Sequence, residues 1–177
     1  MTTYIVLLRA VMPTGENKVP MAQLREVLAQ AGFGNVRTYI QSGNVLLDTK
    51  LSATETQNRI HDLIKEHIGP DLVVVVRTGV QLQRMLANNP FQAGCDISRV
   101  FFVMFAQTPP AEKVKELLTQ DFADEKLAIA GDAAYMYIPG TYGRRKLSSN
   151  FLEKMLNVSA TMRSFNTLSK LVEMSKG

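Results

Sequence analysis

The sequence predicts an α+β protein made of two βαββαβ subdomains with antiparallel sheets, a short connector helix and an extra C-terminal helix. Two observations predict this class. The order strand, helix, strand, strand, helix, strand can be traced before residue 78 and again from residue 98. At 177 residues the chain is long enough to bury a core without disulfides, and its single cysteine, Cys95, has no partner. We expect an N-terminal subdomain over 1–78, a connector over 79–97 and a C-terminal subdomain over 98–177.

Hydrophobic spacing and turn residues place the elements of the first half. Met21, Leu24 and Leu28 recur at spacings of three and four, which is typical of one helix face, and Gly32 ends that helix. The dipeptide Ser42-Gly43 tolerates the positive φ of a tight hairpin turn. The expected elements are a strand over 4–9, a helix over 20–31, strands over 36–40 and 44–48, a helix from Ser52 or Thr54 to about residue 68, and a strand over 72–77.

The second half shows the same order of elements. Asn88-Asn89-Pro90 closes a short helix, because the residue before a proline avoids helical backbone. Gly131-Asp132 suits a hairpin turn, and the segment from Asn150 to Glu153 resembles a capping box at a helix start. The expected elements are a helix over 80–87, a strand over 98–105, a helix over 110–119, strands over 126–130 and 133–138, a helix over 150–156, a short strand over 158–161 and a helix over 165–174.

Each half has the element order of the split βαβ, or ferredoxin-like, unit, whose strands are arranged 4-1-3-2. This arrangement brings the loop after the first strand and the tip of the hairpin to one end of the sheet. Amide N–H groups at the following helix start, together with a nearby lysine, predict an anion site there. The alternative is that these polar residues only shape the loops, with Arg9 paired to a carboxylate such as Glu16. The expected ligand-binding residues are Arg9, Asn17, Lys18, Gln41, Ser42 and Asn44.

A second candidate site is basic and lies toward the C-terminus. The formal net charge of the chain is +4, and the segment from Gly140 onward holds seven basic and two acidic residues. Arg144, Lys146, Arg163 and Asn166 fall near the starts of the last two helices. A cation there opposes the helix dipole unless an anion, from a ligand or from the protein, lies between them. This pattern predicts a phosphate site, and the alternative is a solvated basic loop.

The sequence lacks the motifs of common catalytic and cofactor-binding classes. It contains no P-loop, dinucleotide fingerprint, G-x-S-x-G elbow or zinc pattern, so we expect no cofactor and no metal and assign no catalytic residue. His61 and His67 lie six residues apart on one helix, a spacing at which they cannot share a metal. Neither a basic leader nor an apolar run of about 18 residues occurs, so we expect a cytoplasmic protein that does not span a membrane.

Three functions are consistent with these features. The first is a binding module for a phosphorylated or nucleic-acid ligand, which the basic C-terminal segment favours. The second is a small-molecule enzyme with its site in a cleft between the two subdomains, where Arg9, Lys18 and Asn44 would position an anionic substrate. The third is a protein-interaction module that uses a sheet edge or the C-terminal helix.

Several motifs resemble those of a known family. They are Leu7-Leu8-Arg9, Gly15 to Met21, Val36 to Val45, Gly143 to Leu147 and Arg163 to Lys170. Together they resemble the bacterial family called domain of unknown function 1697, almost from end to end. The resemblance implies two ferredoxin-like subdomains and implies no known activity. Where that family commonly has Gly-Ile-Asn-Val-Gly-Gly, this chain has Ala10-Val11-Met12-Pro13-Thr14-Gly15, so no role of that asparagine or of the first two glycines is carried over.

Overall fold

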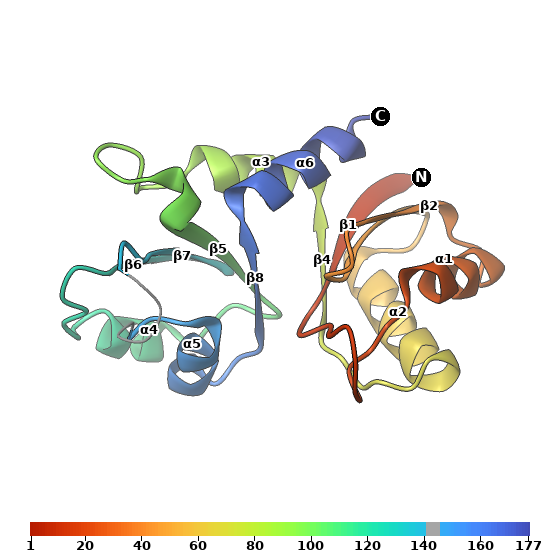
Figure 1. Cartoon of the computed structure of the whole chain (residues 1–177), viewed down its shortest axis with the longest axis horizontal. Coiled ribbons are helices and arrows are strands. Elements are labelled where there is room, and N and C mark those ends of the chain that lie inside the picture. The colour runs from red at the N-terminus through yellow and green to blue at the C-terminus, as the bar shows by residue number, and fades with distance from the viewer. Residues whose placement is uncertain (141–145) are drawn as a thin grey trace. The chain divides into compact units, whose positions relative to one another are not determined.

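The structure, a computed structural model, describes residues 1–140 and 146–177 (Figure 1). The elements, in chain order, are β1 (Thr2–Leu8), α1 (Met21–Gln30), β2 (Gly34–Tyr39), β3 (Asn44–Thr49), α2 (Ala53–His67), β4 (Val74–Thr78), α3 (Gly79–Ala87), a 3-10 turn η1 (Ile97–Arg99), β5 (Val100–Phe105), α4 (Ala111–Leu117), β6 (Lys126–Ala130), β7 (Ala133–Tyr137), α5 (Ser149–Leu156), β8 (Ala160–Ser164) and α6 (Phe165–Ser175). The order βαββαβ therefore occurs twice, as predicted.

The chain divides into two compact units. Unit 1 comprises residues 1–83 and 169–177, and unit 2 comprises residues 84–168. Both boundaries fall inside helices, so α3 and α6 each contribute residues to both units.

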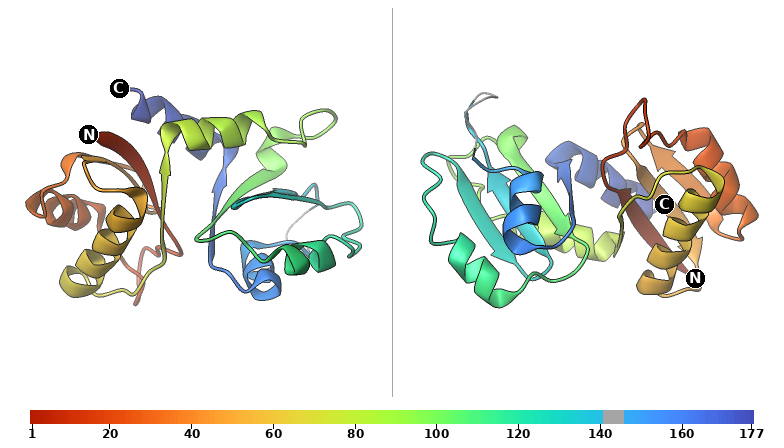
Figure 2. Two further views of the ribbon diagram at one scale, coloured as in Figure 1. Left: turned by 180° about the vertical axis from the view of Figure 1, so that it is seen from behind. Right: turned by 90° about the horizontal axis from the view of Figure 1, so that it is seen from below.

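Each unit contains a four-stranded antiparallel sheet with two helices against one face (Figures 1 and 2). The strand order is β2-β3-β1-β4 in unit 1 and β6-β7-β5-β8 in unit 2. The predicted 4-1-3-2 arrangement is thus confirmed in both units. In unit 1 the central pairing runs from Thr2 opposite Thr49 to Leu7 opposite Asn44.

The core of each unit lies between its sheet and these two helices. In unit 1, Val6 and Leu8 of β1 are fully buried against Leu24 of α1 and Ile60 of α2. Side chains alternate across a strand and recur every three or four residues along a helix, so both patterns place apolar groups on facing surfaces. The corresponding core of unit 2 includes Val103, Phe105, Leu117, Leu152 and Leu156.

The opposite sheet face of unit 2 is also covered. Phe102 of β5 is fully buried, and its ring centroid lies 6.3 Å from that of Phe165 at the start of α6. Tyr135 of β7 donates a hydrogen bond from its hydroxyl to the Met85 carbonyl of α3 at 2.9 Å. At Phe102 and Tyr135 this face is therefore buried, and the Tyr135 hydroxyl has a hydrogen-bond acceptor.

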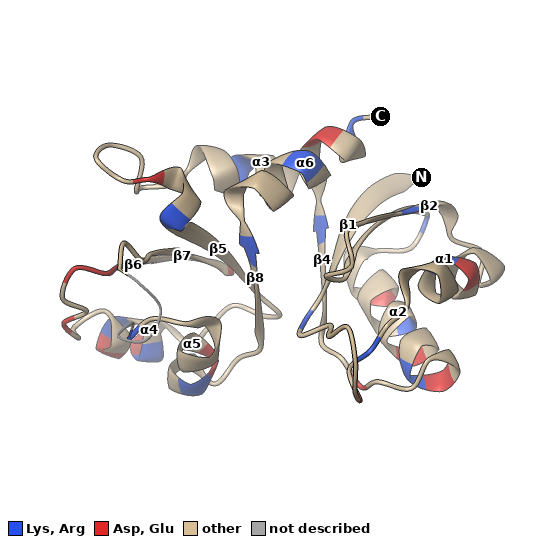
Figure 3. Cartoon of the chain, viewed as in Figure 1, with Lys and Arg blue, Asp and Glu red and all other residues tan. Residues whose placement is uncertain are grey.

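The connector helix and the C-terminal helix are equivalent elements of the two repeats. Figure 3 shows one basic position on each of β4 and β8, and these are Arg77 and Arg163. Each guanidinium donates to the carbonyl of the preceding residue at 2.9 Å. The next residue, Thr78 or Ser164, accepts the N–H three residues later at 3.2 Å and so begins α3 or α6. The repeated unit is therefore βαββαβα.

Several boundaries differ from the sequence prediction by a few residues, and two of the differences have a clear physical reason. The last strand, expected over 158–161, lies at Ala160–Ser164, because β5 pairs with it from Phe105 opposite Ala160 to Phe101 opposite Ser164. The capping box expected at Asn150 is wrong. Ser148 begins α5 instead, since its hydroxyl accepts the Phe151 N–H at 3.0 Å. Hydrophobic spacing locates such a helix, but it does not show which of several nearby polar residues is the N-cap.

We expect Gly43→Ala to destabilise the protein much more than Gly131→Ala, although each glycine lies at a hairpin tip with positive φ. A Cβ at Gly43 would lie 2.8 Å from both Leu8 Cβ and Val11 Cγ2, whereas a Cβ at Gly131 meets nothing within 4 Å. The loss of unfolding free energy should be on the order of 3 kcal/mol for Gly43→Ala and about 1 kcal/mol for Gly131→Ala. Denaturant unfolding measures both, and equal losses would contradict the close packing of the hairpin tip on β1.

Candidate functional site

The loop after β1 and the β2–β3 hairpin tip meet at one end of unit 1. The Leu8 N–H donates to the Gly43 carbonyl at 2.9 Å, which holds the tip beside the point where β1 leaves the sheet. Lys18 and Gln41 line a hollow of about 160 Å³ there, together with Met12, Pro13, Val19 and Pro20. We call it the Lys18 hollow. Two of the residues expected to bind a ligand are thereby brought together.

The loop that carries Lys18 is held by its own backbone. The Met12 N–H donates to the Asn17 carbonyl at 3.0 Å, and the Lys18 N–H donates to the Gly15 carbonyl at 3.3 Å. Gly15 has φ +84°, which a glycine adopts without the steric cost that other residues meet. The Asn17 carbonyl thus accepts a hydrogen bond within the loop. The Lys18 side chain is exposed beside the hollow.

The start of α1 forms one wall of the Lys18 hollow and carries a partial positive charge. Its N-cap is Pro20, which makes no side-chain cap, and its first turn holds no acidic residue. Among the helices of the described chain this combination is unique to α1. Ser52, Thr78, Ser148 and Ser164 cap α2, α3, α5 and α6, and Glu112 lies in the first turn of α4.

Asn44 and Ser42 have structural contacts in the hairpin. Asn44 is fully buried, and its side-chain amide donates to the Tyr39 carbonyl at 3.1 Å and to the Ser42 hydroxyl at 2.9 Å. These bonds fix the conformation of the tip. Arg9 is half-buried, and its backbone N–H donates to the Val73 carbonyl of the loop before β4 at 3.0 Å.

Two residues next to the hollow have strained backbone. Ala10, just before the hollow-lining loop, has φ 57°, and Ile40, just before Gln41, has φ 50°. A left-handed φ is a true outlier for a β-branched residue. Ile40 is also 54 % exposed, so burial of its side chain does not compensate. Such strain tends to cluster at functional sites.

The expected basic site contains an anion that belongs to the protein. Arg144 lies outside the described residues. The Lys146 N–H donates to both carboxylate oxygens of Glu125 at 3.0 and 3.1 Å, and the Leu147 N–H donates to Glu125 Oε2 at 2.7 Å. The Lys146 amine donates to the Asp121 carbonyl at 3.1 Å. Glu125, only 8 % exposed, thus supplies a negative charge at the backbone of Lys146 and Leu147.

Arg163 belongs to a strand and makes different contacts from Lys146. Its Nη1 donates to the Thr161 hydroxyl at 2.6 Å and to the Met162 carbonyl at 2.9 Å. Burial lowers the pKa of Arg163 to about 10, so it stays cationic at neutral pH. Asn166 is exposed in the first turn of α6. The sequence analysis assigned Arg163 and Lys146 to one site, whereas the structure places Arg163 in β8 and Lys146 in the loop before α5.

Histidine and cysteine side chains make no metal centre in the described residues, where no group of three or more His, Cys, Asp or Glu could hold an ion. His61 Nε2 lies 2.6 Å from Asp71 Oδ1, and His61 Nδ1 lies 3.1 Å from Asp62 Oδ1. Cys95 is half-buried and lines a separate hollow of about 390 Å³ in unit 2. Within the described part of the chain no helix has the length and apolar character needed to cross a membrane.

The fold defines a two-unit α+β protein whose repeats are both ferredoxin-like. The chain belongs to a protein family of unknown function, DUF1697, whose family model matches residues 1–135. It is also similar in structure to the conserved bacterial protein SP0830 from Streptococcus pneumoniae, with a TM-score of 0.74 and 23 % identity over 100 % of this chain and 99 % of that chain. At this identity the likeness supports the fold alone. No curated protein shows detectable sequence similarity to the chain.

We expect Glu125→Ala to lower the unfolding free energy by on the order of 3 kcal/mol, because three N–H···O contacts to a buried carboxylate are lost together. Glu125→Gln keeps one acceptor oxygen and should cost less. Asp124→Ala, at the exposed neighbouring position, is the control and should change stability by less than about 0.5 kcal/mol. Denaturant unfolding compares the three variants, and a Glu125→Ala loss no larger than that of Asp124→Ala would contradict the buried-anion assignment.

We expect His61→Gln to destabilise the protein at acidic pH more than at alkaline pH. Hydrogen bonds to Asp71 and Asp62 raise the pKa of His61. Stability from a raised histidine pKa is fully present below the unfolded value and is lost as pH rises through the folded value. Thermal unfolding at about pH 5.5 and about pH 9 measures the difference, with His67→Gln as the control for losing an exposed histidine of the same helix. An equal shift for His61→Gln at both pH values would contradict the ion pairs.

Proposed function

We propose that the protein is a binding module for a small phosphorylated ligand, whose phosphate group binds in the Lys18 hollow. One observation carries the proposal: the helix start that walls this hollow has neither a capping side chain nor an acidic residue, and Lys18 and Gln41 flank it. A phosphate would accept from the first-turn N–H groups, from the lysine amine and from the glutamine amide.

The contrast with α4 supports this assignment. Both α1 and α4 begin after a proline N-cap that makes no side-chain hydrogen bond. The first turn of α4 contains Glu112, which complements the positive end of the helix dipole. The first turn of α1 has no such residue in the described chain, so an external anion would meet a complementary field there.

The Lys18 hollow has room for a phosphate group. A hollow of 160 Å³ holds about five water-sized groups at about 30 Å³ each. That volume accommodates the five heavy atoms of a phosphate, and the rest of a ligand can extend out of the open hollow. RNA-binding modules of this fold class also stack bases on sheet-face aromatics. Here the aromatic Phe102 of unit 2 is fully buried against other rings, which favours a small phosphorylated molecule over a nucleic acid.

We expect glycerol 3-phosphate to bind and glycerol not to bind. Titration of ¹⁵N-labelled protein at low salt should shift the amide signals of Lys18, Met21 and Gln41. Lys18→Gln should weaken the affinity about tenfold, which corresponds to about 1.4 kcal/mol. Lys115→Gln, which removes an exposed lysine from α4, is the charge-matched control and should leave the affinity unchanged.

A second variant tests the helix start directly. Ala22→Glu places a carboxylate in the first turn of α1 at an exposed position. It should raise the unfolding free energy by about 0.5 kcal/mol through the helix dipole and also weaken glycerol 3-phosphate binding. Absence of binding by the unmodified protein would contradict the proposal. Salt-sensitive binding of an oligonucleotide without binding of glycerol 3-phosphate would point to nucleic acid instead.

A further inference from the structure

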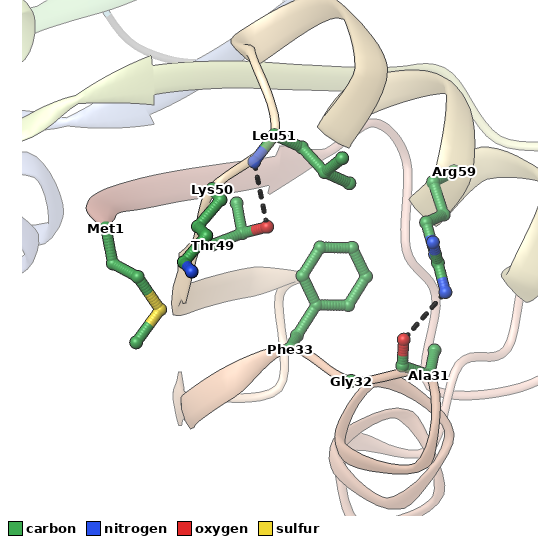
Figure 4. Close-up of a pocket in the computed structure, with 8 residues that line it drawn as sticks. All are labelled: Met1, Ala31, Gly32, Phe33, Thr49, Lys50, Leu51 and Arg59. Atoms are coloured by element: carbon green, nitrogen blue, oxygen red, sulfur yellow. Dashed lines mark hydrogen bonds between the residues drawn. The ribbon is translucent and has the colours of Figure 1, made fainter.

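A second hollow lies at the other end of the sheet of unit 1, where β1 begins and β3 ends. It is lined by Met1, Ala31, Gly32, Phe33, Thr49, Lys50, Leu51 and Arg59 (Figure 4). We call it the Lys50 hollow. Its volume of about 280 Å³ has room for about nine water-sized groups at about 30 Å³ each. Its lining combines apolar side chains with two cations, and no lining residue is acidic.

The end of α1 builds one wall of the Lys50 hollow. Gly32 has φ +95° and reverses the chain after the helix, and the Phe33 N–H then donates to the Leu28 carbonyl at 3.2 Å. This turn places Phe33 at the edge of the core, where the residue is 6 % exposed. Figure 4 shows its ring between Thr49 on one side and Arg59 on the other. The ring is therefore held in the core and presents only a small edge to the hollow.

Arg59 of α2 is held in place by two contacts. Its Nη2 donates to the Ala31 carbonyl at 2.7 Å, and its guanidinium carbon lies 5.8 Å from the centroid of the Phe33 ring. A guanidinium has five N–H donors, so one bond to a carbonyl leaves most of them for other acceptors. Fixing the side chain in advance lowers the entropy that a ligand would otherwise lose on binding.

Lys50 is exposed and faces the same hollow. Among the ion pairs of the described residues neither Lys50 nor Arg59 takes part. The neighbouring Thr49 hydroxyl accepts the Leu51 N–H at 3.2 Å and can donate its own proton. The rim of the Lys50 hollow thus presents donors and positive charge, while Phe33 and Leu51 present apolar surface.

We propose that the Lys50 hollow binds a small carboxylate with an apolar or aromatic body. The carboxylate accepts from the Arg59 guanidinium, the Lys50 amine adds positive charge on the other side of the Phe33 ring (Figure 4), and the body packs on Leu51 and the edge of Phe33. The volume accommodates a ligand of about ten non-hydrogen atoms, because each occupies nearly as much space as a water molecule. This site does not depend on the proposed phosphate site, since the two hollows share no residue.

Phenylacetate is the probe for this site, and 2-phenylethanol is its neutral counterpart. Titration of ¹⁵N-labelled protein should shift the amide signals of Gly32, Phe33 and Leu51 with saturation below about 20 mM phenylacetate, and 2-phenylethanol should bind at least about tenfold more weakly. Failure to saturate, equal binding of the neutral compound, or shifts confined to residues outside the Lys50 hollow would overturn the proposal.

Matched variants separate this site from general charge effects. Lys50→Gln should weaken phenylacetate binding about fivefold, and Arg59→Lys should weaken it too, because the charge stays while the fork is lost. Lys65→Gln, which removes the amine that pairs with Asp71 on the same unit, should leave the affinity unchanged. Lys18→Gln should also leave it unchanged, so failure of the phosphate site and failure of this one are distinguishable. An unchanged affinity in both Lys50→Gln and Arg59→Lys would overturn the proposal.

Discussion

The antiparallel pairing of β1 with β3 determines where polar groups of unit 1 can meet. Both strands are buried almost throughout, from Thr2 opposite Thr49 at one end to Leu7 opposite Asn44 at the other. Each hollow lies beyond one end of this pairing. A slip of one residue would turn buried side chains to the other face, so the register is strongly specified. Both hollows therefore lie next to a pair of strands whose register is fixed. Lys18 lies in the loop after β1, and Lys50 directly follows β3.

The two repeats share the same strand order, but they differ in the residues at the hairpin-tip end of the sheet. The Phe105 N–H donates to the Asp132 carbonyl at 2.9 Å, as the Leu8 N–H donates to Gly43 in unit 1. The hairpin tip of unit 2 thus carries an aspartate, and the first turn of α4 carries Glu112. Unit 1 has Lys18 and Gln41 at its corresponding end. The duplicated fold therefore carries different charged and polar residues at this end of its two units, among the residues that the structure describes.

Hydrophobic periodicity and turn residues were sufficient to predict the repeat, the strand order and the approach of Lys18 to Gln41. Two features of the candidate sites were not predicted, namely the Glu125 carboxylate and the burial of Asn44. Glu125 lies more than twenty residues before the N–H groups that it binds, and no local pattern marks it among nearby acids. Asn44 looked like a ligand residue because it lies next to a turn, yet full burial commits its amide to the hairpin. Burial and long-range pairing arise only when the elements pack.

Elsewhere in the chain, backbone N–H groups bind an anion in the way proposed for the Lys18 hollow. At the segment before α5, backbone N–H groups bind the Glu125 carboxylate, so that anion is built into the fold. The start of α1 has the same helix polarity, and its first turn contains no acidic residue. Beside it, Ile40 holds a left-handed backbone that costs on the order of 1 kcal/mol or more. That conformation directs the chain into Gln41, so the buried β1–β3 pairing stabilises a strained tip whose next residue lines the hollow.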